Sequence, residues 1–379
     1  MIYKISDNIV SALGFDTEEN FNNIKSGKSG LQIFTNPFGL DGDFCLGKID
    51  DAILDKEFSK IKKDDFEYTK LEKAVILSVY KAAKPINLQL NRDDVLFVFS
   101  TTKGNVDFLE NGVNPISERA YLWKTAEIVC DFFNNKAKPI VVSNACVSGI
   151  VAQIVADRNL SAKRYKYAIV CGFDILSKFT VSGFNSFKAL SNEICKPFDI
   201  NRKGLNIAEG AATIIYAEAE ENDIPKNSII IKNHSICNDA NHISGPSRTA
   251  DGLTICINNT VKDFDINKIS FINAHGTATP YNDNMESVAI DRAGMNHIPT
   301  NSLKAYYGHT LGTAGVIETI ISSRALLNNE ILISKGFETL GVDKNITINT
   351  ELQESDKTAF LKMISGFGGT NASILFEKK

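Results

Sequence analysis

The stretch PIVVSNACVSGIVAQIVADRNL, residues 139–160, contains two hydrophobic patterns in direct succession. Its first five residues form a short, β-branched run that is typical of a strand buried on both faces. The residues from Ser148 to Leu160 follow the period of a helix. Cys146 therefore lies at a junction where a strand stops and a helix begins.

This junction makes Cys146 a candidate nucleophile. The turn exposes the sulfur at the end of the sheet, and the positive end of the helix favours thiolate over thiol. The small residues Ala145, Ser148 and Gly149 leave room for a substrate. A cysteine packed at the end of a buried strand fits the same pattern equally well, so its position alone leaves both interpretations open.

Strand-length apolar runs alternate with helical segments along the rest of the chain. This alternation predicts an α/β fold with mostly parallel strands. The two halves have a similar order of elements, which indicates a duplicated fold with halves at 1–220 and 221–379, joined near the charged run 217–227. The mixed-charge segment 59–83 is expected to be a surface helix. Strands are predicted at 94–100, 139–143, 167–171, 229–234, 269–274, 359–364 and 372–376, and helices at 122–134, 148–160, 284–293 and 313–328.

Composition narrows the class of protein. The chain has 379 residues, of which 43% are hydrophobic, enough for one large core or two fused ones. Its net charge of -4 comes from both signs, so the totals indicate no nucleic-acid surface. It contains no run of eighteen or more apolar residues, so we expect no membrane insertion. The seven cysteines form no C-x-x-C pair, which favours a reducing compartment and a cytoplasmic protein.

Two of the five histidines, His275 and His309, lie beside glycine where elements end. Side chains at such places are presented rather than buried. Beside a cysteine, two neutral imidazole N–H groups can donate to the oxygen of a thioester enolate. Zinc is the competing explanation, but the spacings resemble no zinc ligand pattern, so we expect no metal. The remaining histidines are interpreted as ordinary surface or packed residues: His234, His242 and His297.

Two further segments carry candidate residues. Asp283 and Glu286 begin a helix soon after His275, where they can complement the helix N-terminus, support Lys304 or a histidine, or do both. The run SGFGGTN, residues 365–371, lies between two apolar strands. It can be a hairpin turn, or it can bring the N–H of Phe367 beside that of Cys146 as an oxyanion hole.

Five motifs in chain order carry a resemblance. They are NACVSG at 144–149, KPFDINRKGLNIAEGA at 196–211, HGTATPYNDNMES at 275–287, SLKAYYGHTLGTAG at 302–315 and GFGGTNA at 366–372. Together they resemble the β-ketoacyl-acyl carrier protein synthases, in the elongating Cys-His-His branch of the thiolase superfamily. The resemblance implies an α/β thiolase fold with duplicated βαβαβαββ halves in a five-layered αβαβα sandwich.

The resemblance also implies roles for individual residues. Cys146 would carry the acyl chain, His275 and His309 would bind the thioester oxygen of malonyl-carrier protein, and Lys304 would order the site electrostatically. The remaining matches are Thr277 and Thr279 to contacts of the phosphopantetheine arm, Asp283 and Glu286 to supporting acids, and Phe367 to a backbone donor and gate. Ser365 departs from the pattern, because many members have phenylalanine there, and it predicts a looser entrance for substrate.

The implied reaction is a decarboxylative Claisen condensation in fatty-acid, polyene or polyketide biosynthesis. It needs an acyl carrier protein and its phosphopantetheine arm but no bound cofactor, and the enzyme would be a homodimer or a heterodimer with a related subunit. A thiolase acting on coenzyme A thioesters is one alternative, although no second reactive cysteine lies after Cys256. The other is a non-catalytic chain-length partner, against which the presence of Cys146 argues.

Overall fold

Ten strands form one mixed sheet in the computed structural model, which describes residues 1–110 and 117–379. The strands of the first half are β1 (Ile2–Ser11), β4 (Val95–Ser100), β5 (Ile140–Val142), β6 (Tyr167–Asp174) and β7 (Gly210–Glu218). Those of the second half are β8 (Ile229–Asn238), β9 (Ile269–Asn273), β10 (Thr300–Asn301), β13 (Ala359–Gly366) and β14 (Thr370–Lys378). The two halves meet where β1 pairs with β8 through Tyr3–Ile230 and Lys4–Ile229.

The same strand order occurs twice in this sheet. The first half has the order β5-β4-β6-β7-β1, and the second half has β10-β9-β13-β14-β8. In each half the first three strands of this order are parallel to one another, and the remaining two pairs of neighbouring strands are antiparallel. Each half therefore follows the βαβαβαββ pattern implied by the resemblance.

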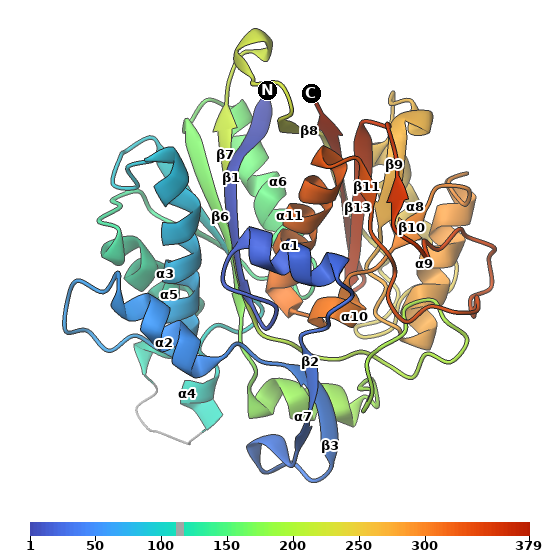
Figure 1. Cartoon of the computed structure of the whole chain (residues 1–379), viewed down its shortest axis with the longest axis horizontal. Coiled ribbons are helices and arrows are strands. Elements are labelled where there is room, and N and C mark those ends of the chain that lie inside the picture. The colour runs from blue at the N-terminus through green and yellow to red at the C-terminus, as the bar shows by residue number, and fades with distance from the viewer. Residues whose placement is uncertain (111–116) are drawn as a thin grey trace.

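Helices complete a five-layered sandwich (Figure 1). The outer layers are α3 (Lys70–Ala83) with α5 (Leu122–Phe132) and α8 (Asp251–Thr260) with α9 (Pro280–Arg292). The central layer consists of α6 (Ser148–Ser161) and α11 (Ala314–Leu327), which contact each other between the two sheet halves. A Cβ on Gly315 would lie 2.7 Å from the backbone nitrogen of Ile150, so glycine is needed at this helix crossing. The predicted fold class is confirmed.

Shorter elements complete the chain. They are α1 (Thr17–Lys25), β2 (Leu31–Thr35), β3 (Asp43–Gly47), α2 (Asp51–Ser59), α4 (Asp107–Glu110), α7 (Lys178–Ser186), α10 (Lys304–Tyr307), β11 (Glu330–Ile331) and β12 (Gln353–Glu354). The candidate residues Cys146, His275 and Lys304 come within a few positions of the ends of β5, β9 and β10, respectively. Ligands commonly bind where the parallel strands of α/β sheets end.

The prediction of one surface helix over 59–83 is wrong. Helix α2 ends at Ser59, and α3 begins at Lys70 after a capping box formed by Thr69 and Glu72. Most of α3 is buried against the sheet and α5, because its lysines occupy one face while apolar side chains cover the other. The predicted start of α9 at residue 284 is also late, since Pro280 occupies the first turn, where its missing N–H costs nothing.

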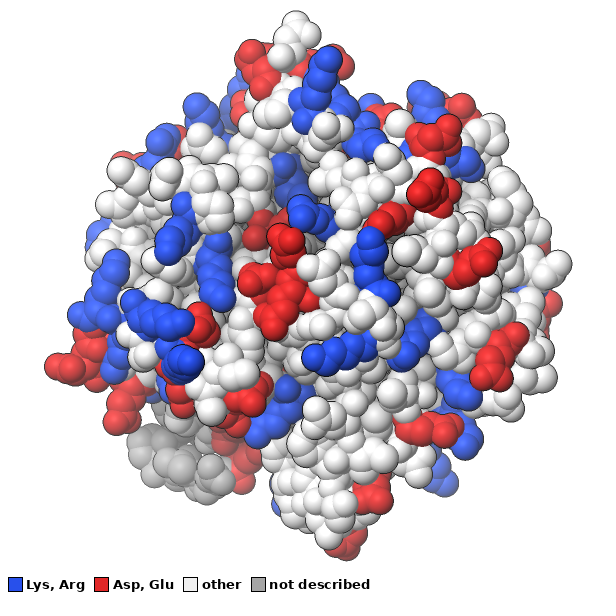
Figure 2. Space-filling view, in the orientation of Figure 1, with Lys and Arg blue, Asp and Glu red and all other residues white. Residues whose placement is uncertain are grey.

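Charges of both signs alternate over the face seen in Figure 2. Many of them pair locally, such as Lys73 Nζ with Asp55 Oδ1 at 2.7 Å. This agrees with the balanced composition. None of the helices in the described ranges is long and apolar enough to cross a membrane.

Candidate active site

The turn between β5 and α6 presents Cys146. Ala145 has a φ of 44°, in the left-handed region that non-glycine residues rarely adopt. Ser148 Oγ holds this conformation, because it donates to Ala145 O at 2.6 Å and accepts the N–H of Asn144 at 2.8 Å. The strained turn therefore places Cys146 in the lining of a pocket.

Burial raises the pKa of the Cys146 thiol to about 12. Lys304 and the backbone N–H groups of Phe367 and Cys146 act in the opposite direction. The expectation that the helix start favours thiolate is therefore not met, since the cost of burying the charged form outweighs it. Both N–H groups act on the sulfur, and the oxyanion hole that they would form stays a prediction.

His309 contacts the sulfur directly. Its Nε2 lies 3.0 Å from Cys146 Sγ, and its Nδ1 accepts the N–H of Leu311 at 3.3 Å. Because Nδ1 uses its lone pair for that bond, the proton of the neutral ring is on Nε2. His309 therefore presents an N–H donor to the sulfur, and the same N–H can donate to a substrate oxygen that enters the pocket.

His275 lies opposite His309 in the same pocket. The two ring centroids are 5.1 Å apart, with the rings nearly perpendicular. Burial lowers the pKa of both imidazoles well below the ordinary value, and the nearby Lys304 lowers it further. Both histidines are therefore neutral at pH 7. Nδ1 of His275 is buried and has no hydrogen-bond partner within the described part of the chain.

Two carboxylates of α9 hold the loop that carries His275. Glu286 accepts the N–H groups of His275 and Gly276, each at 2.7 Å, and Asp283 accepts those of Ala278 at 3.1 Å and Phe198 at 2.7 Å. Burial raises the pKa of Asp283 to about 6 and that of Glu286 to about 7. Both alternatives that the sequence left open find support, because these contacts hold the histidine loop and Asp283 also lies in the first turn of α9.

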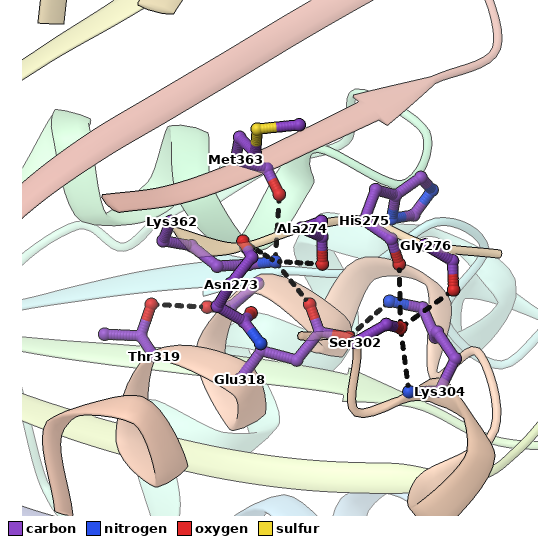
Figure 3. A network of polar contacts seen from close by, with 12 residues as sticks. Asn273, Ala274, His275, Gly276, Ser302, Lys304, Glu318, Thr319, Lys362 and Met363 are labelled. Atoms are coloured by element: carbon purple, nitrogen blue, oxygen red, sulfur yellow. Dashed lines mark hydrogen bonds and ion pairs between the residues drawn. The ribbon is translucent and has the colours of Figure 1, made fainter. Parts of the chain in front are cut away.

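Behind the histidines lies a buried charged cluster, shown in Figure 3. Lys304 Nζ pairs with one oxygen of Glu318, and Lys362 Nζ lies 2.7 Å from the other. Burial acts to raise the pKa of Glu318, but the two lysines together hold it below the ordinary value. Sequence reasoning missed Glu318 and Lys362. Lys362 is the lone charge in the strand β13, and Glu318 shares the mostly apolar helix α11 only with Arg324, a pattern that could have drawn attention to both.

The pocket has a volume of about 300 Å³ and gathers seven of the predicted residues. These are Cys146, His275, Thr277, Thr279, His309, Ser365 and Phe367. The other three, Lys304, Asp283 and Glu286, are buried and do not line it. His242, interpreted as an ordinary histidine, also lines the pocket, and its Nδ1 accepts the N–H groups of Ser244 and Gly245 at 3.2 and 3.1 Å.

Phe367 lies at the mouth of the pocket, and Ser365, two residues earlier, lines the pocket from a buried position. The Phe367 ring is 39% exposed and stacks on Phe184 of α7, with centroids 5.6 Å apart. Ser365 Oγ donates to Asn371 Oδ1 at 2.7 Å, and Asn371 Nδ2 donates to Asp239 Oδ1 at 2.9 Å. Ser365 therefore does more than replace a phenylalanine ring, because its hydroxyl holds the side-chain amide of Asn371, which in turn donates to Asp239.

One nitrogen from each histidine and the cysteine sulfur lie within 4.8 Å of one another, a separation that could suit a metal ion. Two ligands of a tetrahedral zinc, one sulfur and one nitrogen, lie about 3.5 Å apart, given the usual bond lengths. The 3.0 Å between His309 Nε2 and Cys146 Sγ is shorter and fits a hydrogen bond. The absence of a metal stays a prediction.

The repeated halves and the site between them define a protein of the thiolase fold. Residues 7–222 match the family described as Beta-ketoacyl synthase, N-terminal domain, and residues 229–337 match Beta-ketoacyl synthase, C-terminal domain. The chain belongs to the β-ketoacyl synthase family. The family predicted from the five motifs is therefore confirmed.

Individual relatives and structures agree with this assignment. The chain is 30% identical over 268 residues to the 3-oxoacyl-acyl-carrier-protein synthase 2 of Coxiella burnetii, covering 65% of this chain and 63% of that one. It is 27% identical over 256 residues to the enzyme of that name from Vibrio harveyi, covering 63% and 61%. These alignments span just under two thirds of both relatives. A ketosynthase in complex with its chain length factor, from Xenorhabdus doucetiae, shares the fold with a TM-score of 0.86 and 22% identity, covering 100% of this chain and 98% of that one.

Proposed function

We propose that this chain is a β-ketoacyl-acyl carrier protein synthase that performs a decarboxylative Claisen condensation. The reaction would serve fatty-acid, polyene or polyketide biosynthesis. The observation that carries the proposal is the 3.0 Å contact between Cys146 Sγ and an N–H donor of His309, with neutral His275 in the same pocket. A buried nucleophile beside two neutral donors suits acyl transfer followed by enolate formation.

The first half of the cycle loads the enzyme. The sulfur of Cys146 attacks the thioester carbonyl of an acyl-carrier protein, the bond to the pantetheine sulfur breaks, and the thiol proton passes to that leaving sulfur. The N–H groups of Cys146 and Phe367 stabilise the tetrahedral oxyanion. One such preorganised donor contributes about 3–4 kcal/mol in comparable acyl-transfer sites.

The second half forms the carbon-carbon bond. Malonyl-carrier protein loses carbon dioxide, and the electron pair of the broken bond gives an enolate whose oxygen accepts hydrogen bonds from His275 and His309. Its α-carbon attacks the thioester carbonyl on Cys146, the bond to Sγ breaks, and the sulfur recovers a proton from solvent. Lys304 would keep both imidazoles neutral, while Thr277 and Thr279 would contact the pantetheine arm.

Partners follow from the same reaction. An acyl carrier protein would deliver both substrates on its phosphopantetheine arm, and no resident cofactor is needed. The complex of the Xenorhabdus ketosynthase with its chain length factor supports a heterodimer with a related subunit here, with a homodimer as the other arrangement. All seven cysteines are free thiols, which suits the reducing cytoplasm.

We also propose that the halves 1–220 and 221–379 are the two domains of the chain. The repeated strand order supports this division, because β7 completes the first half at Glu218 and β8 begins the second at Ile229. The nucleophile would then lie in the first domain and both histidines in the second.

Intact-mass analysis after incubation with acyl-carrier proteins tests the proposal. The wild type should gain one acyl group and, after addition of malonyl-carrier protein, release carbon dioxide and a β-ketoacyl product. Cys146→Ala should neither gain an acyl group nor form a β-ketoacyl product, while it melts like the wild type. Cys130→Ala, which truncates a buried cysteine outside the pocket, is the matched control and should load normally. Condensation by Cys146→Ala at the wild-type rate would show that the nucleophile is wrong. A panel of saturated and polyunsaturated chains would assign the pathway.

A further inference from the structure

Lys362 of β13 is a fully buried cation that the proposed reaction has not yet used (Figure 3). Its Nζ lies 2.7 Å from Glu318 Oε2 and 2.9 Å from Met363 O. It also lies 3.3 Å from Ala274 O and 3.4 Å from Asn273 O. A buried ammonium is costly unless its hydrogens have acceptors, and the three carbonyl oxygens supply one for each hydrogen, while Glu318 supplies the opposite charge.

The two carbonyls place Lys362 directly behind a site residue. Asn273 is the last residue of β9 and the register partner of Lys362 in the sheet, and Ala274 immediately precedes His275. On the other side of the same segment, Glu286 accepts the His275 N–H, and Ser302 Oγ donates to Gly276 O at 2.8 Å. The backbone that carries His275 is therefore held by three side chains: Lys362 of β13, Glu286 of α9 and Ser302, which follows β10.

The cluster also contains unequal charge. Two ammonium groups, those of Lys304 and Lys362, share the single carboxylate of Glu318, which leaves one positive charge close to the histidines. The titratable groups that face Lys362 are Glu318 from α11, Lys304 from α10 and Glu286 from α9. After burial and Lys304, Lys362 is a further cause of the lowered pKa of both His275 and His309.

We propose that Lys362 is a positioning residue for decarboxylation and condensation, whose ammonium ties the end of β9, and with it His275, to the Glu318–Lys304 pair. The inference rests on the proposed function and deepens it. A backbone held in this way keeps the His275 ring oriented toward the enolate oxygen, and the unneutralised charge favours an anion at that point. The alternative is a buried ion pair that only stabilises the fold.

Lys362→Met removes the charge and the donors and keeps a similar length. The parent protein for this assay is Cys146→Gln, because its amide side chain imitates an acylated cysteine. When Lys362→Met is added to this parent, the kcat for release of carbon dioxide from malonyl-carrier protein should fall by about tenfold to a hundredfold, as for a displaced catalytic group. KM should hardly change, since Lys362 does not line the pocket. The matched control is Leu361→Met, a volume-conserving change of the neighbouring buried residue on the same strand, which should behave like its parent.

The dependence of kcat on pH distinguishes a positioning role of Lys362 from a role in fold stability alone. Removal of a cation raises the pKa of a neighbouring imidazole, so the acid limb of kcat should move to higher pH in Lys362→Met and stay in place in Leu361→Met. Burial lowers the pKa of Lys362 to about 8, so the parent should also lose activity above that pH, and the variant should lack this limb. If Lys362→Met does not fold, Lys362→Gln takes its place in the same kinetic and pH measurements.

Unchanged kcat and an unmoved acid limb in the Lys362 variant would overturn the inference. A fall in melting temperature with normal kcat would show that the ion pair is only structural. The proposed function has its own point of failure, because a wild type that neither loads an acyl group nor releases carbon dioxide refutes it before any Lys362 variant is compared.

Discussion

His309→Ala should separate the two halves of the reaction. In the structure, Leu311 N–H fixes the ring so that Nε2 carries the proton, and His309 is 1% exposed, so neither the tautomer nor the ring has freedom to rearrange. Loss of one such preorganised donor costs about 2.7–4 kcal/mol of transition-state stabilisation, or about a hundredfold to a thousandfold in rate. Decarboxylation should slow by this factor. Acylation of Cys146 should persist, because its oxyanion rests on backbone N–H groups.

The assay uses two readouts on the same preparation. Carbon dioxide release from malonyl-carrier protein reports the enolate step in the Cys146→Gln parent, and intact mass reports acyl loading in the chain that keeps Cys146. His297→Ala, an exposed histidine outside the pocket, is the matched control and should change neither. His275→Ala should resemble His309→Ala, and the double change should cost far less than the sum, since groups that act as a unit are not additive.

Two results would refute this reasoning. Normal carbon dioxide release in both single variants would mean that the enolate oxygen does not rest on the histidines. Loss of acyl loading together with decarboxylation would mean that His309 takes part in acyl transfer, and its 3.0 Å contact with Cys146 Sγ would then have to be interpreted as that of a base.

Ser365→Phe should reduce acylation by long or rigid chains more than acylation by short ones. Ser365→Ala loses only the hydrogen bond to Asn371, so it separates the effect of the added ring from that of the lost hydroxyl. A preference for short saturated chains that neither substitution alters would contradict this prediction. Burial raises the pKa of Glu286 from its ordinary 4.5 to about 7, so the folded chain binds that proton more tightly, and the stability it contributes is lost as pH rises through this window. The melting temperature should therefore fall less between pH 4.5 and 7 in Glu286→Gln than in the wild type, and equal slopes would show that Glu286 is not the group responsible. Treatment with a metal chelator should leave condensation unchanged, whereas a loss restored by Zn²⁺ would make Cys146 and the histidines metal ligands.

Much of the fold could be predicted because its elements are encoded locally. The β-branched runs at 94–100 and 167–171 are strands, and the period that begins at Ser148 is a helix, as expected. The prediction of a surface helix over 59–83 failed, because the spacing of lysines in the sequence does not reveal how much of a helix is buried by neighbouring elements. Only the packing of α3 against the sheet and α5 settles that it is buried.

The sequence by itself determined the three candidate residues that line the pocket. Cys146, His275 and His309 each lie in a short motif at the end of an element, and the structure brings them into one pocket. What only the tertiary structure decided is their protonation and the support behind them. Lys362 and Glu318 are 44 residues apart, on a strand and a helix with no local motif, and they become partners only when β13 packs beside α11. The pKa of a buried group depends on the water it loses and the charges that surround it, and both are properties of the folded chain.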